Sequence, residues 1–237
     1  MSSDRWAGYG AAAGSLAIAL YVAASLVIGG PPDFEASGAE VAAHLERNST
    51  RIQVGSAINA ASTPFFVWFL ATVASLARGG GPGARRAGAV AFACGTIFIA
   101  LFLVDLTALA VSALRPENMA AAPELAAALR DFEWLAMGMA AFPVAGMLAA
   151  FAVLSLRDGA VWPRWLGRLA ALAALAYAMR IGTLFTTEGA FAADGVLGLW
   201  VPAIAAAAWI LVGSLMLALN VRAPEPGGTG ASYLTGN

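Results

Sequence analysis

The sequence predicts an all-α, polytopic membrane helix bundle. Hydrophobic residues make up 60% of the 237 positions and charged residues only 11%, whereas soluble domains average about 25% charged residues. A helix needs about 20 apolar residues to cross a bilayer. Six segments meet this length and are predicted to span: 9–30, 52–77, 87–114, 133–156, 165–187 and 195–220. We therefore expect one transmembrane domain over residues 1–222, followed by a Gly/Pro-rich, disordered cytoplasmic tail at 223–237.

Arginines between the predicted spans set the expected orientation. The links after the second and fourth spans carry Arg78, Arg85, Arg86, Arg157, Arg164 and Arg168. The other links are acidic, although they also contain Arg47, Arg51, Arg115 and Arg130. Since positive loops stay in the cytoplasm, both termini are predicted to be cytoplasmic and the acidic links outside. The Ala-, Gly- and Arg-rich composition favours a bacterial protein, so we expect the inner (plasma) membrane.

Two outer segments resemble each other, Glu40–Leu45 and Glu124–Leu129. Each is predicted to form a short amphipathic helix on the outer surface. Pro64 and Pro143 lie inside the spans that come after these segments, and a proline within a helix removes a backbone hydrogen bond and kinks it. We therefore expect two kinked spans, each preceded by a surface helix.

Asp105 and Arg180 are the most unusual residues of the predicted spans. A carboxylate near the centre of a membrane helix costs about 2.5–3.5 kcal/mol on insertion scales, so it requires a partner or a function. Arg180 is the basic residue that lies deep in another span. The two residues either form a structural ion pair between their helices or belong to a functional site.

Polar and aromatic residues gather in the outer half of the predicted spans, when depth is counted at about 1.5 Å per residue. This placement predicts a polar cavity open to the outside, with an apolar floor. Asp105 and Glu133 are the candidate acids. The candidate substrate-binding residues are Asn59, Ser62, Phe66, Trp68, Trp134, Tyr177 and Arg180. Tryptophans near helix ends are typical of interfacial belts, here Trp134, Trp162, Trp165 and Trp200.

Composition excludes several functions. The chain has no lysine, so a lysine Schiff base is excluded, and its net charge of −1 gives no reason to expect nucleic acid. With a lone His44 and a lone Cys94, we predict no metal site and no cofactor. The expected partners are membrane lipids and a hydrophobic small molecule, and a homodimer is compatible with the sequence.

The chain resembles a family of small six-helix membrane proteins, common in actinobacteria and grouped as a domain of unknown function. The resemblance rests on PPDFEASGAEVAAHLERNSTRI before the second span and PRWLGRLA before the fifth. It implies the six-helix fold and supplies no catalytic residues. In layout, the chain is also similar to integral-membrane terpene cyclases, which implies embedded acids and aromatic walls.

Three functions are compatible with these features. One is an enzyme that protonates an isoprenoid or lipid-like substrate, as the likeness to terpene cyclases implies. The second is a protein that binds or transports a small molecule or lipid. The third is a structural accessory subunit of a membrane complex.

Overall fold

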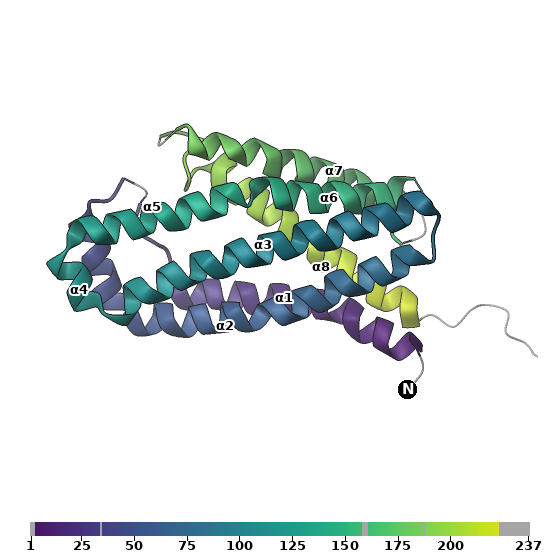
Figure 1. Cartoon of the computed structure of the whole chain (residues 1–237), viewed down its shortest axis with the longest axis horizontal. Coiled ribbons are helices and arrows are strands. Elements are labelled where there is room, and N and C mark those ends of the chain that lie inside the picture. Colours follow the sequence, from purple (N-terminus) through teal and green to yellow (C-terminus); the bar gives the residue numbers. More distant parts are fainter. Residues whose placement is uncertain (1–2, 34, 158–160, 187, 223–237) are drawn as a thin grey trace, which may run out of the picture.

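The computed structural model describes residues 3–33, 35–157, 161–186 and 188–222, which form an all-α bundle without strands (Figure 1). The elements are α1 (Ser3–Ile28), α2 (Gly38–Arg78), α3 (Pro82–Leu114), α4 (Pro116–Ala121), α5 (Pro123–Met139), α6 (Ala141–Leu156), α7 (Arg164–Met179), the 3₁₀ helix η1 (Arg180–Leu184), the π-helix η2 (Val196–Trp200) and α8 (Val201–Arg222). The predicted tail at 223–237 lies outside the described residues.

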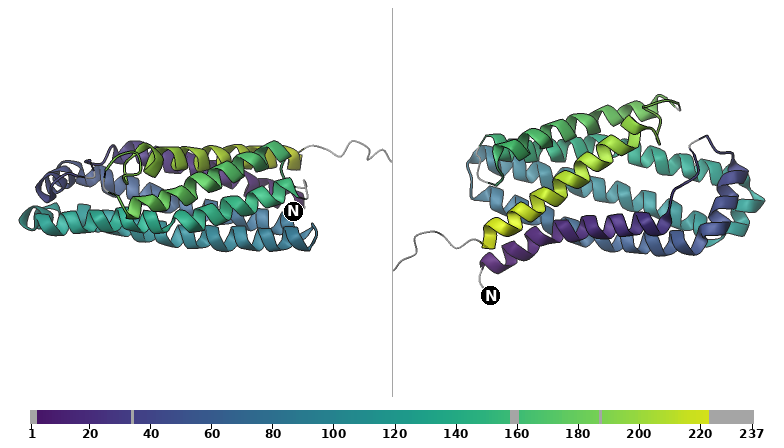
Figure 2. Two further views of the ribbon diagram at one scale, coloured as in Figure 1. Left: turned by 90° about the horizontal axis from the view of Figure 1, so that it is seen from above. Right: turned by 180° about the vertical axis from the view of Figure 1, so that it is seen from behind.

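The long helices form a closed ring. Each packs against the next along the chain, with α3 beside both α5 and α6, and α8 closes the ring by packing against α7 and α1. α5 and α6 run in the same direction as one rod, and α1, α2, α3, this rod, α7 and α8 alternate in direction, as Figures 1 and 2 show. The interior of this ring is where a core or a cavity forms.

Helix starts follow local sequence signals. Ser37 and Glu40 form a capping box at the start of α2, in which each side chain accepts a hydrogen bond from the backbone N–H of the other residue. Prolines occupy the first position of α3, α4 and α5, where a missing N–H costs nothing because the first turn leaves it unpaired. The Gly79–Gly81 stretch ends α2. These signals fix the ends of α2 and leave it uninterrupted for 41 residues.

The segments expected as separate surface helices, 40–45 and 124–129, are helical but run without a break into the predicted spans. Residues 40–45 belong to α2 and residues 124–129 to α5. No glycine or proline separates either segment from its span, so nothing stops the helix. A short surface helix does occur at α4.

The two internal prolines are accommodated differently. The backbone stays helical through Pro64 of α2. Three residues before Pro143, the helix is interrupted at Ala140, which separates α5 from α6. A proline cannot donate to the carbonyl four residues earlier, here that of Met139, so the interruption lies where the bond is lost.

Among the described residues, five helical stretches are long and apolar enough to cross a membrane: Gly8–Ile28, Gly38–Arg78, Pro82–Leu114, Pro123–Leu156 and Val196–Leu219. The chain is therefore a multi-pass membrane protein. The expected fifth span, 165–187, is represented by α7, which has only 16 residues, and by η1, which extends it to Leu184. The described part of the chain thus has five stretches that meet the criteria for a span, and the expected sixth would have to be formed by α7 together with η1.

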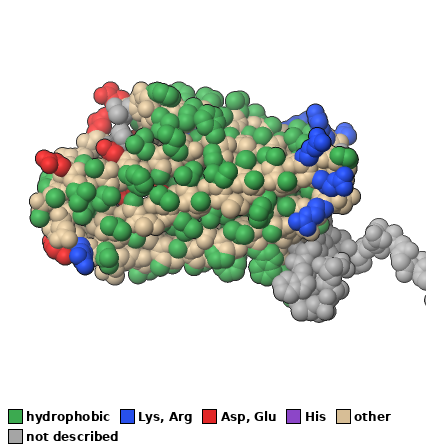
Figure 3. All heavy atoms as spheres, in the orientation of Figure 1, with side chains coloured by type: hydrophobic (Ala, Val, Ile, Leu, Met, Phe, Trp, Pro, Cys, Tyr) green, Lys and Arg blue, Asp and Glu red, His purple; other side chains and the backbone are tan. Residues whose placement is uncertain are grey.

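Charged side chains gather at the two ends of the bundle, mostly arginines at one end and mostly acidic residues at the other (Figure 3). The α2–α3 and α6–α7 links form what we call the arginine end, and the α1–α2 link with α4 and the 185–195 link form the acidic end. In the half near the arginine end, the interior is a packed apolar core. Phe69, Leu70, Phe151, Trp162 and Trp209 are each at most 3% exposed there.

Trp162 differs from the belt that its position near a helix end predicted. It is 1% exposed, packs edge-on against Trp209 at 5.0 Å between ring centroids, and donates its indole N–H to the Gly213 carbonyl. Trp165 and Trp200 are about half exposed, at 49% and 57%, as belt residues are. The core thus takes one of the tryptophans that sequence position assigned to the interface.

Candidate functional site

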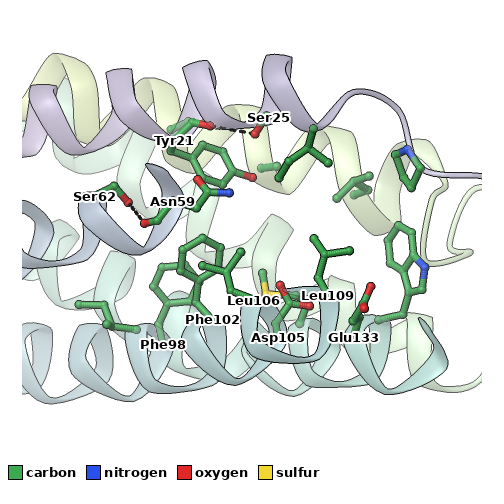
Figure 4. Close-up of a pocket in the computed structure, with 18 of the residues that line it drawn as sticks. Tyr21, Ser25, Asn59, Ser62, Phe98, Phe102, Asp105, Leu106, Leu109 and Glu133 are labelled. Atoms are coloured by element: carbon green, nitrogen blue, oxygen red, sulfur yellow. Dashed lines mark hydrogen bonds between the residues drawn. The ribbon is translucent and has the colours of Figure 1, made fainter. Parts of the chain in front are cut away.

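A cavity of about 320 Å³ occupies the interior of the ring in the half near the acidic end. Eight of the nine sequence-predicted site residues line it: Asn59, Ser62, Phe66, Asp105, Glu133, Trp134, Tyr177 and Arg180. They come from α2, α3, α5, α7 and η1. Residues far apart in the sequence therefore line the same cavity, part of which Figure 4 shows.

Trp68 is the predicted site residue that does not line the cavity. At 100° per residue, the nine positions from Asn59 to Trp68 turn about 180° around the α2 axis, whereas the seven positions to Phe66 return within about 20°. Trp68 is 39% exposed and lies beside Gly10 of α1. The position of Trp68 along α2 was predicted at the level of the cavity, but its side chain lies on the opposite face of the helix.

Asp105 and Glu133 lie at the same level of the bundle. Asp105 is 23 residues from the start of α3 at Pro82, and Glu133 is 23 residues from the end of α6 at Leu156. Both helices meet the arginine end there, so each carboxyl lies about 34 Å from that end. The two side chains are close enough for their charges to interact, and Figure 4 shows them on adjacent helices at the cavity wall.

Arg180 reaches the same region from η1, which packs against α5. It is only 3% exposed, and a side-chain hydrogen bond links it to Tyr177. No hydrogen bond or ion pair joins it to Asp105, both residues being described, so the two interact through charge alone. The structural ion pair that the sequence left open is therefore not formed.

Arg130 is a cavity residue that the sequence analysis treated only as a charge outside the orientation pattern. It lines the cavity, is 6% exposed, and donates from Nη2 to the backbone carbonyls of Pro32 and Asp33. Its position on α5 could have revealed it: four residues after Ala126 and three before Glu133, it lies on the same helical face. Arg130 thereby fastens the α1–α2 link over the acidic end of the cavity.

Aromatic rings form the cavity wall toward the core. Phe66 of α2 meets Phe98 of α3 edge-on at 6.2 Å between centroids, and Phe98 stacks with Phe102 at 5.8 Å. Tyr21 of α1 packs against Phe102 at 6.2 Å. Phe98 and Phe102 were missed, although they precede Asp105 at the spacing of one helix face, and Tyr21 with Ser25 shows the same spacing.

Several buried polar atoms at this cavity have no hydrogen-bond partner among the described residues. They are Asn59 Oδ1, Arg180 Nε, and Nε and Nη1 of Arg130. Buried polar atoms in native proteins are nearly always paired, and leaving one unpaired costs about 1–3 kcal/mol. The cavity wall is mostly apolar, and besides its two carboxyls it carries an unpartnered acceptor and charged donors, which suits a ligand with a polar end.

His44 of α2 adds an imidazole group at the acidic end of the cavity. Its Nδ1 lies 3.4 Å from the side-chain nitrogen of Asn48. In the described part of the chain, no group of three or more His, Cys, Asp or Glu residues is placed to hold a metal ion.

Toward the arginine end the cavity stops at the packed core. Phe69 and Phe151 are completely buried there, and Phe151 stacks on Trp209 with centroids 4.6 Å apart. This buried aromatic cluster therefore lies between the cavity and the arginine end.

No family model matches the chain, and neither the curated proteins nor the solved structures include a significant match to it. The resemblance to the six-helix family of unknown function accordingly stays a prediction.

Proposed function

We propose that this membrane protein binds an amphiphilic, lipid-like small molecule in the cavity near its acidic end. The observation that carries this proposal is the combination of an aromatic and aliphatic wall with unpartnered, nearly completely buried polar atoms on Asn59, Arg130 and Arg180. The volume of about 320 Å³ lies at the lower end of the range of ligand pockets, about 300–1,000 Å³. The apolar part of the ligand lies against Phe66, Phe98 and Phe102.

The polar end of the ligand is placed by the unpartnered atoms. Asn59 Oδ1 accepts a hydrogen bond from the ligand, and the Arg180 and Arg130 guanidiniums donate to it. Charge-assisted hydrogen bonds of this kind are stronger than neutral ones. The proposed location is the plasma membrane of a bacterium, with the arginine end in the cytoplasm and the cavity in the outer half of the bilayer.

Native mass spectrometry of the protein in mild detergent tests this proposal. We expect a discrete bound mass of lipid or isoprenoid size on the wild-type protein. Arg180→Gln and Asn59→Leu should each reduce its occupancy about tenfold or more, because they remove its polar contacts. Thr96→Val, an exposed change on α3 away from the cavity, is the matched control and should retain the ligand. A clean apoprotein mass across several mild detergents would contradict the proposal.

A second candidate function is acid-initiated isomerisation or cyclisation of an isoprenoid, favoured by the neighbouring carboxyls of Asp105 and Glu133. Two ionised carboxyls would repel each other, so in this proposal one of the two is protonated and the other ionised. The protonated acid would add H⁺ to a carbon–carbon double bond, and the aromatic faces of Phe98 and Phe102 would stabilise the carbocation. The other carboxylate would then remove a proton to form a new double bond, so the reaction is balanced without a cofactor.

This chemistry is tested with farnesol and geranylgeraniol as probes, supplied to reconstituted protein in D₂O. The expected product is an isomer of the probe that carries one carbon-bound deuterium in place of a hydrogen. Asp105→Asn and Glu133→Gln should each abolish its formation, whereas Thr96→Val should not. If the wild-type protein retains a ligand but yields no deuterated product from either isoprenoid alcohol, the binding proposal stands and this enzymatic proposal fails for these substrates.

Transport and a structural accessory role receive less support. Transport requires a polar path to the second side, and the packed aromatic core lies where that path would run. A structural accessory role would be favoured by an Asp105–Arg180 ion pair and no cavity between the helices. The described residues instead form a cavity, and these two side chains are not paired. A homodimer stays a prediction.

A further inference from the structure

We propose that the ligand reaches the cavity sideways from the hydrocarbon layer of the membrane, through an opening between α1 and α8. The inference rests on the proposed binding function and names its ligand class more narrowly: an amphiphile that resides in the bilayer. The opening is bordered by Tyr21 and Ser25 of α1 and by Ala203 and Ala207 of α8, which all line the cavity.

Helices α1 and α8 are neighbours in the ring. Near the arginine end the two helices are held together by Ser214, whose hydroxyl donates to the Ala11 carbonyl and accepts from the Ser15 N–H. A Cβ at Gly14 would lie 2.8 Å from Ser214 Oγ, so the backbones approach closely there. Toward the acidic end, α8 crosses obliquely away from α1, as the back view in Figure 2 shows. The two helices therefore converge at one end and diverge where the cavity lies.

Both helices turn one face to the cavity along the diverging stretch. The lining residues of α1 are Ala17, Ile18, Tyr21, Ser25 and Ile28, and those of α8 with η2 are Leu199, Ala203, Ala206, Ala207 and Ile210. Both sets follow the three- and four-residue spacing of a single helix face. The residues bordering the opening on α8 are alanines, which leave it unfilled. Tyr21 lines the cavity from α1 and is 36% exposed.

The rim of the proposed opening is apolar. Large apolar residues are exposed on both sides of the opening: Val22 and Leu26 on α1 and Trp200 and Ile204 on η2 and α8 are between 46% and 74% exposed. An apolar rim of this kind faces lipid in a membrane protein rather than water. At the acidic end, by contrast, Arg130 fastens the α1–α2 link across the cavity through the Pro32 and Asp33 carbonyls. The side of the bundle is thus the more open route for an apolar molecule.

The orientation of the bound amphiphile is set by the same arrangement. Tyr21 at the opening lies near enough to Asp105 and Arg180 for their charges to act on its hydroxyl, so a polar head that passes it comes close to these groups. Figure 4 shows Tyr21 on α1 directed across the cavity toward α3. The head group would come to lie among the buried polar atoms, while the chain would extend along the aromatic wall or back through the opening.

The test uses the rate at which a cysteine in the cavity is labelled, so it does not depend on the identity of the ligand. In a Cys94→Ser background, Ser62→Cys places a thiol on the cavity wall, at a position that is 5% exposed. The protein is reconstituted into phosphatidylcholine vesicles and treated with pyrene-maleimide, which partitions into bilayers. Ala203→Phe and Ala207→Phe block the opening, and Ile204→Phe, on the lipid-facing side of the same helix, is the matched control.

We expect the two blocking substitutions to slow labelling at least tenfold and the control to stay within about twofold of the parent, with all variants eluting as folded protein on size exclusion. Unchanged labelling in both blocked variants would overturn the proposal. Faster labelling by a charged, water-soluble thiosulfonate than by pyrene-maleimide would also overturn it, because the cavity would then open to water. If the lateral route fails while native mass spectrometry still detects a bound molecule, the binding function survives and only the route is wrong.

Discussion

Two arginines are buried at the cavity, and the structure gives them different tasks. Arg180 interacts with Tyr177, whereas Arg130 donates to two backbone carbonyls of the α1–α2 link. Hydrogen bonds from charged donors contribute about 1.5–3 kcal/mol each. We therefore expect Arg130→Met to lower the free energy of unfolding by about 2–4 kcal/mol, measured by thermal unfolding in mild detergent. Arg115→Met, at an exposed position near the same end, is the control, and equal effects of the two changes would contradict this role.

Asp105 is expected to behave in the opposite way. Breaking a buried ion pair costs about 3–5 kcal/mol because a charge is left uncompensated, but Asp105 has no such pair with Arg180. Asp105→Asn should therefore change the free energy of unfolding by less than about 1 kcal/mol, since it also removes the repulsion from Glu133. Thermal unfolding of this variant beside the wild type checks the expectation. A loss of the size expected for a broken ion pair would show that the two residues are bonded in the membrane.

At the scale of single residues, the sequence predicted depth well and the helix face less well. The rise per residue is fixed, so counting along each span placed Asn59, Asp105 and Glu133 at compatible levels. The helix face depends on the angle between two positions. Asn59 and Trp68 lie about half a turn apart around the α2 axis, so they could not both face the cavity. Arg130 was missed because its charge was interpreted only as a topology signal, although its partners are backbone carbonyls that no sequence pattern specifies.

At the scale of elements, Pro64 in α2 shows how a helix keeps its backbone satisfied around a proline. The Ala60 carbonyl, four residues earlier, lacks its usual N–H donor and accepts instead from the Thr63 hydroxyl at 2.8 Å. Hydroxyl side chains commonly satisfy carbonyls freed by proline in membrane helices. Thr63→Val should therefore cost about 0.5–1.5 kcal/mol in the presence of Pro64.

In a Pro64→Ala background, the restored backbone N–H serves the same carbonyl, so the cost of Thr63→Val should fall close to zero. A double-mutant cycle measured by thermal unfolding gives this coupling directly. Identical costs in the two backgrounds would mean that the hydroxyl has no role in supporting the proline.

The α1 helix depends on glycines where it meets α2 and α8. A Cβ at Gly14 would lie 2.8 Å from both Phe69 Cδ2 and Ser214 Oγ, so Gly14→Ala requires the helices to separate. We expect a loss of about 1–3 kcal/mol, typical of overpacking. Gly83→Ala, in the first turn of α3 with nothing within 4 Å of the added Cβ, should instead stabilise the protein by about 0.4–1 kcal/mol. Thermal unfolding of both variants tests the contrast, and a destabilising Gly83→Ala would contradict it.

For the whole molecule, the sequence predicted an all-α bundle and most of its spans because hydrophobic length is a direct physical requirement of the bilayer. The closed ring and the divergence of α8 from α1 were not predictable in this way. They depend on which faces meet, and small residues such as Gly14 and Ser214 look alike to hydropathy whether they pack or face lipid. The π-helical start of α8 and the 3₁₀ end of α7 likewise result from local packing that periodicity does not encode.

Orientation in the membrane is the property of the whole molecule that most constrains the cavity. If the arginine end is cytoplasmic, as the distribution of arginines indicates, the cavity draws from the outer leaflet. Single cysteines in a Cys94→Ser background report this directly, at Gly83→Cys in the arginine end and Glu117→Cys in the acidic end. In intact bacterial cells, a membrane-impermeant maleimide should label the cysteine at 117 and leave the one at 83 unlabelled until the membrane is permeabilised. The reverse pattern would place the cavity in the inner leaflet, so that its ligand would have to come from the cytoplasmic side.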